Sequence, residues 1–469
     1  MVNILFISSG GQVLNKNIDL TKGKILSVLL KLALPIMGTS FIQMFYNMVD
    51  MLWIGRLGSG AVAAIGTAGF FSWFGGSFIL ISKVGAEVGV AQSVGLKDDE
   101  GVKKYISNSI IINIILAFAY GIVLIIFRNQ IIDFFDLGDE GIVRDAIIYL
   151  VIIALGTAFN FINPIFTSIF NGTGDSKTPF IINTVGLVFN IVFDPVLIFG
   201  LGPFPALGVA GAAIATVLAQ VVVTLIFIYH IFQKNHYYFR VNYFKYWDKE
   251  YVYKISKMGF PVAVQNGLFS FFSMVLAKII AGFGPTPIAV QKVGSQIEAI
   301  SWMTAGGFST AIGTFIGQNY GAKKWDRIKK GYIAVMGMAI ITGLAATILL
   351  VFLGGEIFSL FLPNEDAIRL GETYLKILGY SQLFMCVEIT AAGAFNGFGK
   401  TTIPSVVSIV FTALRIPLAL FLSKSTALGL DGVWWSISLS SVVKGILVTF
   451  LFWLLILRPV INNQIVKYK

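Results

Sequence analysis

The chain has 469 residues, of which 56% are hydrophobic and only 12% are charged. Soluble globular proteins carry about a quarter charged residues, so this composition, with a mean hydropathy of +0.83, excludes a water-soluble globular domain. The net charge of +11 does not indicate nucleic-acid binding, because the sequence offers no soluble basic surface.

Apolar blocks long enough to cross a bilayer recur along the whole chain. A transmembrane helix needs about 20 predominantly apolar residues to cross a hydrocarbon core of about 30 Å. We therefore predict an all-α polytopic membrane protein with twelve transmembrane helices. In chain order the predicted spans are 26–55, 62–93, 103–127, 144–170, 178–200, 208–232, 252–282, 286–317, 330–353, 369–395, 402–422 and 431–457.

Lysine and arginine gather in every second connection between these spans, which is typical of loops on the cytoplasmic side. The remaining connections are poor in basic residues and hold several acids. We therefore expect a multi-pass protein of the plasma membrane with both termini in the cytoplasm. The basic residues outside the central connection are Lys16, Lys22, Lys24, Lys97, Lys103, Lys104, Lys323, Lys324, Arg327, Lys329, Lys330, Lys467 and Lys469.

The longest connection between spans is polar, aromatic and basic, and it lies near the middle of the chain. Its position predicts a linker between two halves of six spans each. The expected organisation is a cytoplasmic tail at 1–25, a bundle at 26–232, a cytoplasmic linker at 233–251, a second bundle at 252–457 and a cytoplasmic tail at 458–469.

The two predicted bundles repeat one another at an offset of about 226 positions. Each repeat contains an even number of spans, so both enter the membrane in the same sense and should be related by a pseudo-two-fold axis along the membrane normal. Secondary transporters place their substrate sites at such a repeat interface. The matching residues are Pro35 and Pro261, Gly58 and Gly284, Gln92 and Gln318, Gly95 and Gly321, Lys97 and Lys323, Tyr149 and Tyr374, Asn171 and Asn396, Gly174 and Gly399, and Pro179 and Pro404.

Several motifs together resemble the multidrug and toxic compound extrusion (MATE) transporters along essentially the whole chain. They are Pro35, the Tyr-Asn-Met-Val-Asp-Met-Leu-Trp-Ile-Gly segment at 46–55, the Gly-Gln-Asn-Tyr-Gly-Ala run at 317–322 and the Asn-Gly-x-Gly turns after spans 4 and 10. The resemblance implies a secondary-active multidrug exporter of amphipathic, often cationic compounds, driven by inward proton or sodium flow.

We expect no enzymatic activity and no cofactor, because phosphate-loop and metal-ligand patterns are absent from the sequence. The expected partners are small amphipathic or cationic substrates and membrane lipids, without nucleic acid. The chain is expected to act as a monomer.

Two acids are predicted at membrane depth, where a carboxylate is costly and needs a reason to be present. Asp50 and Asp194 lie near the outer ends of spans 1 and 5, both about 8–9 Å below the outer surface at about 1.5 Å per residue. Tyr46 and Asn190 lie one helical turn before them on the same helix faces. The matched depth permits the two acids to share one site.

We predict that these acids form the site that couples ion flow to transport. Burial favours the neutral form of a carboxyl group, and protonation or sodium binding would bias the conformational equilibrium. Sodium would prefer the several oxygens of Asp50, Asn190 and Asp194, with Thr216 as a weaker candidate. The sequence does not choose between the two ions.

The alternative is that each acid is paired permanently with a base such as Arg56 or Lys83 and only locks helices together. The repeat favours the coupling role, because Asp50 corresponds to Leu276 and Asp194 to about Ile416. An acid required by the fold should occur in both halves.

Further polar groups of the first half are predicted to line a substrate cavity. The cavity candidates are Met37, Gln43, Tyr46 and Asn163. Pro35 and Pro195 remove backbone donors and are expected to kink or loosen their helices.

The roles of the remaining intramembrane charges stay open between cavity groups, interhelical pairs and residues that reach the interface. These charges are Lys83, Glu87, Lys278, Lys292, Glu298, Glu388, Arg415 and Lys444. Three of them keep an alternative function open, a lipid-linked oligosaccharide flippase of similar fold, whose cavity would need the bases Lys278, Lys292 and Arg415. A prenyl-transferring enzyme is disfavoured, because the adjacent acids at 98–100 lie in a predicted cytoplasmic loop.

Overall fold

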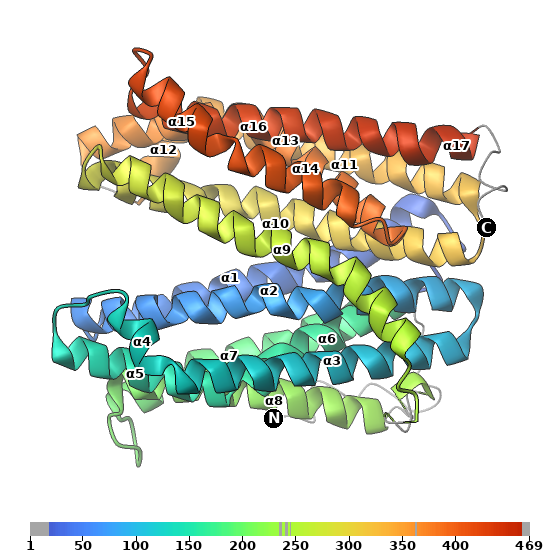
Figure 1. The fold of residues 1–469 in the computed structure, drawn as a ribbon, viewed down its shortest axis with the longest axis horizontal. Coiled ribbons are helices and arrows are strands. Elements are labelled where there is room, and N and C mark those ends of the chain that lie inside the picture. Colours follow the sequence, from blue (N-terminus) through green and yellow to red (C-terminus); the bar gives the residue numbers. More distant parts are fainter. Residues whose placement is uncertain (1–17, 234–236, 240–242, 244, 362–363, 462–469) are drawn as a thin grey trace.

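The computed structural model describes residues 18–233, 237–239, 243, 245–361 and 364–461, and within these ranges it contains helices and no strand. The predicted tails and linker lie partly outside the described residues. The helices form two bundles, α1 to α8 and α9 to α17, which lie one above the other in Figure 1.

The first bundle contains α1 (Ile25–Gly55), α2 (Ser59–Leu96), α3 (Asp99–Ile126), α4 (Arg128–Asp133), α5 (Glu140–Leu155), α6 (Thr157–Thr173), α7 (Lys177–Phe199) and α8 (Gly208–Gln233). The second contains α9 (Lys249–Ala281), α10 (Pro285–Gly321), α11 (Trp325–Phe352), α12 (Gly354–Ser359), α13 (Glu365–Gly397), α14 (Thr402–Ala413), α15 (Arg415–Lys424), α16 (Leu430–Phe452) and α17 (Arg458–Ile461). A 3-10 turn (Tyr237–Phe239) lies in the linker, and a π-helical turn (Trp453–Leu457) joins α16 to α17.

Ten helical segments of the described residues are long and apolar enough to cross a membrane, with α14 and α15 counted as one. The bent pair α5 and α6 supplies one more, and α10, with 37 residues, is the twelfth helix of the predicted pattern although it is less apolar. The chain is therefore a multi-pass helical membrane protein.

The prediction of one continuous span at 144–170 was wrong. The helix breaks at Gly156, and its two parts differ in direction by 49°. A Cβ at Gly156 would lie 2.5 Å from a methyl group of Val217, so α8 approaches the chain too closely for a larger residue. The predicted span at 402–422 is likewise divided at Leu414 into α14 and α15.

The repeated Asn-Gly-x-Gly motif ends a helix in each bundle. Gly174 follows α6 with φ of 91°, and Gly399 follows α13 with φ of 72°. These left-handed conformations favour glycine, which has no Cβ to clash with the backbone.

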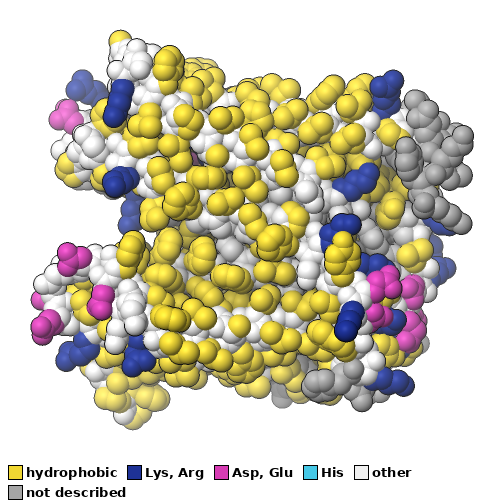
Figure 2. Space-filling model, in the orientation of Figure 1, with side chains coloured by type: hydrophobic (Ala, Val, Ile, Leu, Met, Phe, Trp, Pro, Cys, Tyr) yellow, Lys and Arg dark blue, Asp and Glu magenta, His cyan; other side chains and the backbone are white. Residues whose placement is uncertain are grey.

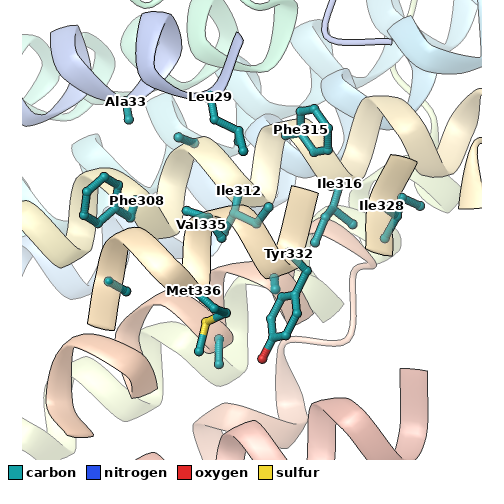
Figure 3. Close-up of a cluster of buried hydrophobic side chains, with 14 of the residues drawn as sticks. Leu29, Ala33, Phe308, Ile312, Phe315, Ile316, Ile328, Tyr332, Val335 and Met336 are labelled. Carbon is teal, nitrogen blue, oxygen red and sulfur yellow. The ribbon is translucent and has the colours of Figure 1, made fainter. Parts of the chain in front are cut away.

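The first half of α1 packs against the second bundle. Figure 3 shows Leu29 and Ala33 of α1 beside Phe308 and Ile312 of α10. This shared core also includes α11 residues such as Val335. The second half of α1 belongs to the first bundle, where it packs against α7.

Helix α9 makes the reciprocal crossing. Gly85 of α2 lies against Ile255 of α9, and Gly259 of α9 lies against Ile81 of α2. Farther along, Leu276 and Ile280 of α9 pack in the second bundle. The diagonal course of α9 from one bundle to the other is visible in Figure 1. The first half of α1 therefore packs against the second bundle, and the first half of α9 packs against the first bundle.

We call the end of the molecule that holds residues 18–24 and the described part of the linker the linker end. Here Asn319 and Arg327 of the second bundle donate to the carbonyl of Leu20. Asn108 of α3 donates to the carbonyl of Tyr246 and accepts from the backbone of Asp248. The segments that precede α1 and α9 are thus each docked on the opposite bundle.

The opposite end, which holds the α4–α5 and α9–α10 connections, is called the loop end. The outline of the molecule is notched between the bundles at this end, and hydrophobic side chains cover the face between the two ends (Figure 2). Charged side chains gather near the ends, as expected for a protein surrounded by lipid.

Candidate functional site

Asp50 and Asp194 come together in the interior of the first bundle. Asp50 lies in the second half of α1 and Asp194 lies in α7, and their carboxyl groups are close enough to interact electrostatically. The Asp194 side chain is completely buried. Two adjacent carboxylates repel each other at such a site, so the pair requires a proton or a cation between its oxygens.

No basic residue satisfies this pair. Among the described residues, no Lys or Arg nitrogen lies within 4.0 Å of either carboxyl group. Arg56, one of the two bases that the alternative required, stacks instead on the ring of Trp53 at 4.8 Å from its centroid. The pair is therefore not held in a salt bridge.

Oxygen atoms of Tyr46 and Asn190 lie near the two carboxyl groups, and Thr216 of α8 lies near Tyr46. Asn190 donates to Asp194 Oδ1 at 2.8 Å, and Tyr46 lies close enough to interact electrostatically with both acids and with Thr216 of α8. One buried oxygen on each of five side chains has no hydrogen-bond partner. These are Asp50 Oδ1, Asp194 Oδ2, Asn190 Oδ1, the Tyr46 hydroxyl and Thr216 Oγ1.

This set of donors is suited to a small hard cation, which prefers carboxylate, carbonyl and hydroxyl oxygens. It is equally suited to protons, because the carboxyl groups accept them directly. Pro195 follows Asp194 directly inside α7. Because proline has no backbone N–H, it leaves one carbonyl of the preceding helical turn without its hydrogen bond.

Tyr149 of α5 is a site residue that sequence reasoning did not identify. Its ring is buried, and its hydroxyl interacts electrostatically with both Asp50 and Asp194. The sequence signal that points to it is its recurrence as Tyr374 in the second half.

A small cavity of about 20 Å³ adjoins the site between α1, α7 and α8. Gln43 and Tyr46 both line it, as do Asn183 and Gln220. This volume is enough for about one water molecule, so the cavity is a polar pocket of the first bundle and is too small for a drug-sized compound.

Asn163 extends this polar region inside α6. Its side-chain amide donates to the Gln220 backbone and side-chain oxygens at 2.9 Å, and its oxygen accepts from Thr224 at 2.7 Å. Because Gln220 also lines the cavity, Asn163 is connected to it through one residue.

Met37 lies apart from these residues. Its side chain contacts Gly307 of α10, where a Cβ would lie 2.1 Å from Met37 Cγ, and it belongs to the core shared with the second bundle. Pro35 lies within α1 two residues earlier, and its carbonyl accepts from Thr39.

The second bundle holds a different set of interior charges. Glu388 of α13 forms an ion pair with Lys444 of α16 at 3.1 Å. Glu298 of α10 accepts from Tyr374 at 2.6 Å and from Gln382 at 2.9 Å. Arg415 donates to two serines of α16. Each of these charged groups therefore has a hydrogen-bond or ion-pair partner inside the bundle.

Lys278 and Lys292, the other bases of the flippase alternative, have exposed side chains. Arg415, in contrast, is buried. Lys83 is half-buried on α2, one turn from Glu87, whose carboxylate accepts from Thr314 of α10.

The sequence profile of the MatE family matches the chain twice, over residues 35–196 and 261–421. The two matches begin at Pro35 and Pro261, so they reproduce the internal repeat.

Two similar proteins come from bacteria. The "probable multidrug resistance protein NorM" of Thermotoga maritima is 30% identical over 417 residues, which cover 87% of each chain. The "FAD transporter" of Shewanella oneidensis is 22% identical, with 84% of this chain and 87% of that protein covered.

Two solved structures show the same fold. A MATE protein in the bent conformation has a TM-score of 0.89 at 23% identity and covers 96% of this chain and 99% of its own. An outward-facing multidrug resistance MATE family transporter has a TM-score of 0.85 at 23% identity and covers 94% and 97%.

Proposed function

This chain belongs to the MatE family of membrane transporters, and we propose that it is a secondary active multidrug exporter. The proposed substrates are amphipathic, often cationic compounds, and the proposed driving force is inward flow of protons or sodium ions. The name of the Thermotoga maritima relative supports multidrug export.

The observation that carries this proposal is the pair of carboxyl groups, each with a buried oxygen, that has no base beside it. Asp50 and Asp194 have buried oxygen atoms with no partner, and burying such a charge uncompensated is unfavourable. A proton or a cation that enters from outside relieves this cost, and its release restores it. The occupancy of the site therefore changes the stability of the conformation around it, which is the requirement for coupling.

The orientation follows from the distribution of basic residues. We place the linker end in the cytoplasm of a plasma-membrane protein, because Lys97, Lys103 and Arg327 lie there and basic loops favour the cytoplasmic side. The notch between the bundles then faces the outside (Figure 2). In this orientation the coupling ion enters the first bundle from the same side to which the substrate leaves.

The experiment that tests the proposal measures transport of a fluorescent organic cation in proteoliposomes of the purified full-length chain. A proton gradient and a sodium gradient are imposed separately, each with a matched sample in which an ionophore collapses the gradient. We expect one of the two gradients to drive accumulation and its collapse to abolish it. If neither gradient drives transport of any cation or zwitterion in a standard panel, the proposed function is wrong.

A further inference from the structure

Helices α2 and α10 cross at van der Waals contact near the linker end. A Cβ at Gly95 would lie 2.0 Å from the carbonyl oxygen of Gln318, and one at Gly321 would lie 2.1 Å from the carbonyl oxygen of Gln92. Gly95 corresponds to Gly321 in the repeat, and Gln92 corresponds to Gln318. The two contacts are therefore the same contact seen from each bundle, so the crossing lies on the pseudo-two-fold axis.

Two glutamine side chains cross this interface in opposite directions. The Gln92 amide donates to the carbonyl of Gly397 in the second bundle at 2.9 Å. The Gln318 amide donates to the carbonyl of Gly172 in the first bundle, also at 2.9 Å. Gly172 and Gly397 are equivalent residues of the two Asn-Gly-x-Gly motifs. Each bond thus joins the glutamine of one repeat to the glycine of the other.

This reciprocity explains why two short motifs occur twice in the sequence. The Gln-x-x-Gly pattern at Gln92 and Gln318 supplies a donor and a close approach, and the Asn-Gly-x-Gly turn supplies an acceptor. Neither motif contacts the acid pair of the first bundle. Two further side-chain bonds join helices of the two bundles, from Thr314 to Glu87 at 3.3 Å and from Ser77 to Asn266 at 2.9 Å. Neither has a repeat counterpart, because Gly313 stands where Glu87 would recur and Met303 where Ser77 would recur.

We propose that Gln92 and Gln318 form a two-fold latch that holds the bundles together at the linker end, and that both bonds break when the transporter opens to the cytoplasm. The inference rests on the proposed function, because alternating access requires the bundles to separate at this end. In this role both glutamines are positioning residues that set the ratio of closed to open molecules.

Apart from the side-chain bonds of Thr314 and Ser77, the extended contacts between the bundles differ in kind. The first half of α1 lies in the core of the second bundle, and α9 lies against α2, so the chain itself crosses the interface there and these contacts are suited to hinges. The glutamine bonds join separate chain segments through side chains. Water can replace each of them when the interface opens, so that each contributes a small net free energy.

The test measures the distance between two spin labels on the full-length chain in lipid nanodiscs. Lys177 and Thr402 are equivalent, exposed residues at the first turns of α7 and α14, one on each bundle. They are replaced by cysteine in a Cys386→Ser background, because Cys386 is the chain's only cysteine. Pulsed electron paramagnetic resonance then gives the distribution of distances.

The latch variants are Gln92→Met, Gln318→Met and the double variant, which keep side-chain length but lose the donor. We expect each single variant to raise the open-to-closed ratio about fivefold, seen as a growing population of longer distances. The two singles should act alike, and the double variant should exceed both. Gln130→Met, at an exposed glutamine of the loop end, is the matched control and should leave the distances unchanged.

An unchanged distance distribution in a folded double variant would overturn the latch, as would a lower melting temperature without any longer distances. If the double variant does not fold, the two single variants decide in the same way. The measurement needs no ion gradient and no substrate. If the latch variants show longer distances but the unmodified chain has no ion-driven transport, only the proposed function is overturned. If the chain transports but the latch variants show unchanged distances, only this inference is overturned.

Discussion

The two bundles share a helix arrangement but neutralise buried charge differently. In the first, Asp50 and Asp194 face each other with no basic partner among the described residues. In the second, Glu388 is paired with Lys444, and Arg415 lies close enough to interact with both Glu388 and Glu298. Leu276, the counterpart of Asp50, packs against Ala419 and Val433 instead.

The two repeats share the residues that set helix packing, but they do not share their interior charged residues. The duplicated glycines and prolines set helix ends and close approaches, which both bundles need for the same packing. The interior charges are free to differ. A bundle with balanced charges needs nothing from outside, whereas a bundle with two unpaired acids depends on protons or cations. This difference supports the proposal that ion coupling belongs to the first bundle, and it predicts a structural role for the charges of the second.

The largest effect is expected at the acid pair. Asp50→Asn and Asp194→Asn should each abolish gradient-driven transport while the melting temperature stays close to that of the unmodified chain. Asparagine keeps the shape and much of the hydrogen bonding of a protonated aspartate, but it cannot exchange a proton and binds sodium weakly. Transport and melting temperature are measured on the same preparations. Normal transport in both variants would remove the coupling role.

The second test breaks the ion pair of the other bundle. Lys444→Met should lower the free energy of unfolding by about 3–5 kcal/mol, because it leaves Glu388 buried without its partner. Adding Glu388→Gln should recover much of that loss. Chemical denaturation in detergent gives these free energies. A stable Lys444→Met variant that loses transport would instead place a functional charge in the second bundle.

The third test compares two equivalent tyrosines. Tyr374→Phe removes the 2.6 Å hydrogen bond to Glu298 and should cost about 1.5–3 kcal/mol of stability. Tyr149→Phe should cost less than about 1 kcal/mol, because the described residues include no hydrogen-bond partner for its hydroxyl. Its effect should appear in the pH or sodium dependence of transport. Equal destabilisation of both variants would contradict the distinction between the bundles.

The smallest effect is expected outside both interiors, at the ion pair of Lys104 and Asp248 at 2.9 Å. The hydrogen bond from Lys104 holds the pKa of Asp248 below its ordinary value. The stabilisation is therefore present above the unfolded-state pKa of aspartate and is lost as pH falls through the lower folded pKa. Asp248→Asn should leave transport unchanged and alter the melting temperature only slightly at neutral pH. A large loss of transport would show that linker docking matters for the cycle.

The sequence predicted the elements that depend on one helix at a time. Hydropathy predicted the positions of the spans, and the even number of spans per repeat predicted two bundles that enter the membrane in the same sense. The rise of an α-helix predicted that Asp50 and Asp194 lie at the same depth. Helical spacing also placed Asn190 one turn from Asp194, where it donates a hydrogen bond. Each of these properties follows from the rise and period of a single helix.

The tertiary structure decided which helices are neighbours and which faces they turn toward each other. Only packing could show that Asp50 and Asp194 meet, that Tyr149 joins them, that Met37 lies against α10 and that Gln92 and Gln318 exchange bonds across the bundles. The fourth predicted span is also broken at Gly156, where Val217 of α8 lies close to the chain. A period of 3.6 residues fixes positions along a helix and around its axis, but it carries no information on the rotation or the partner that packing selects.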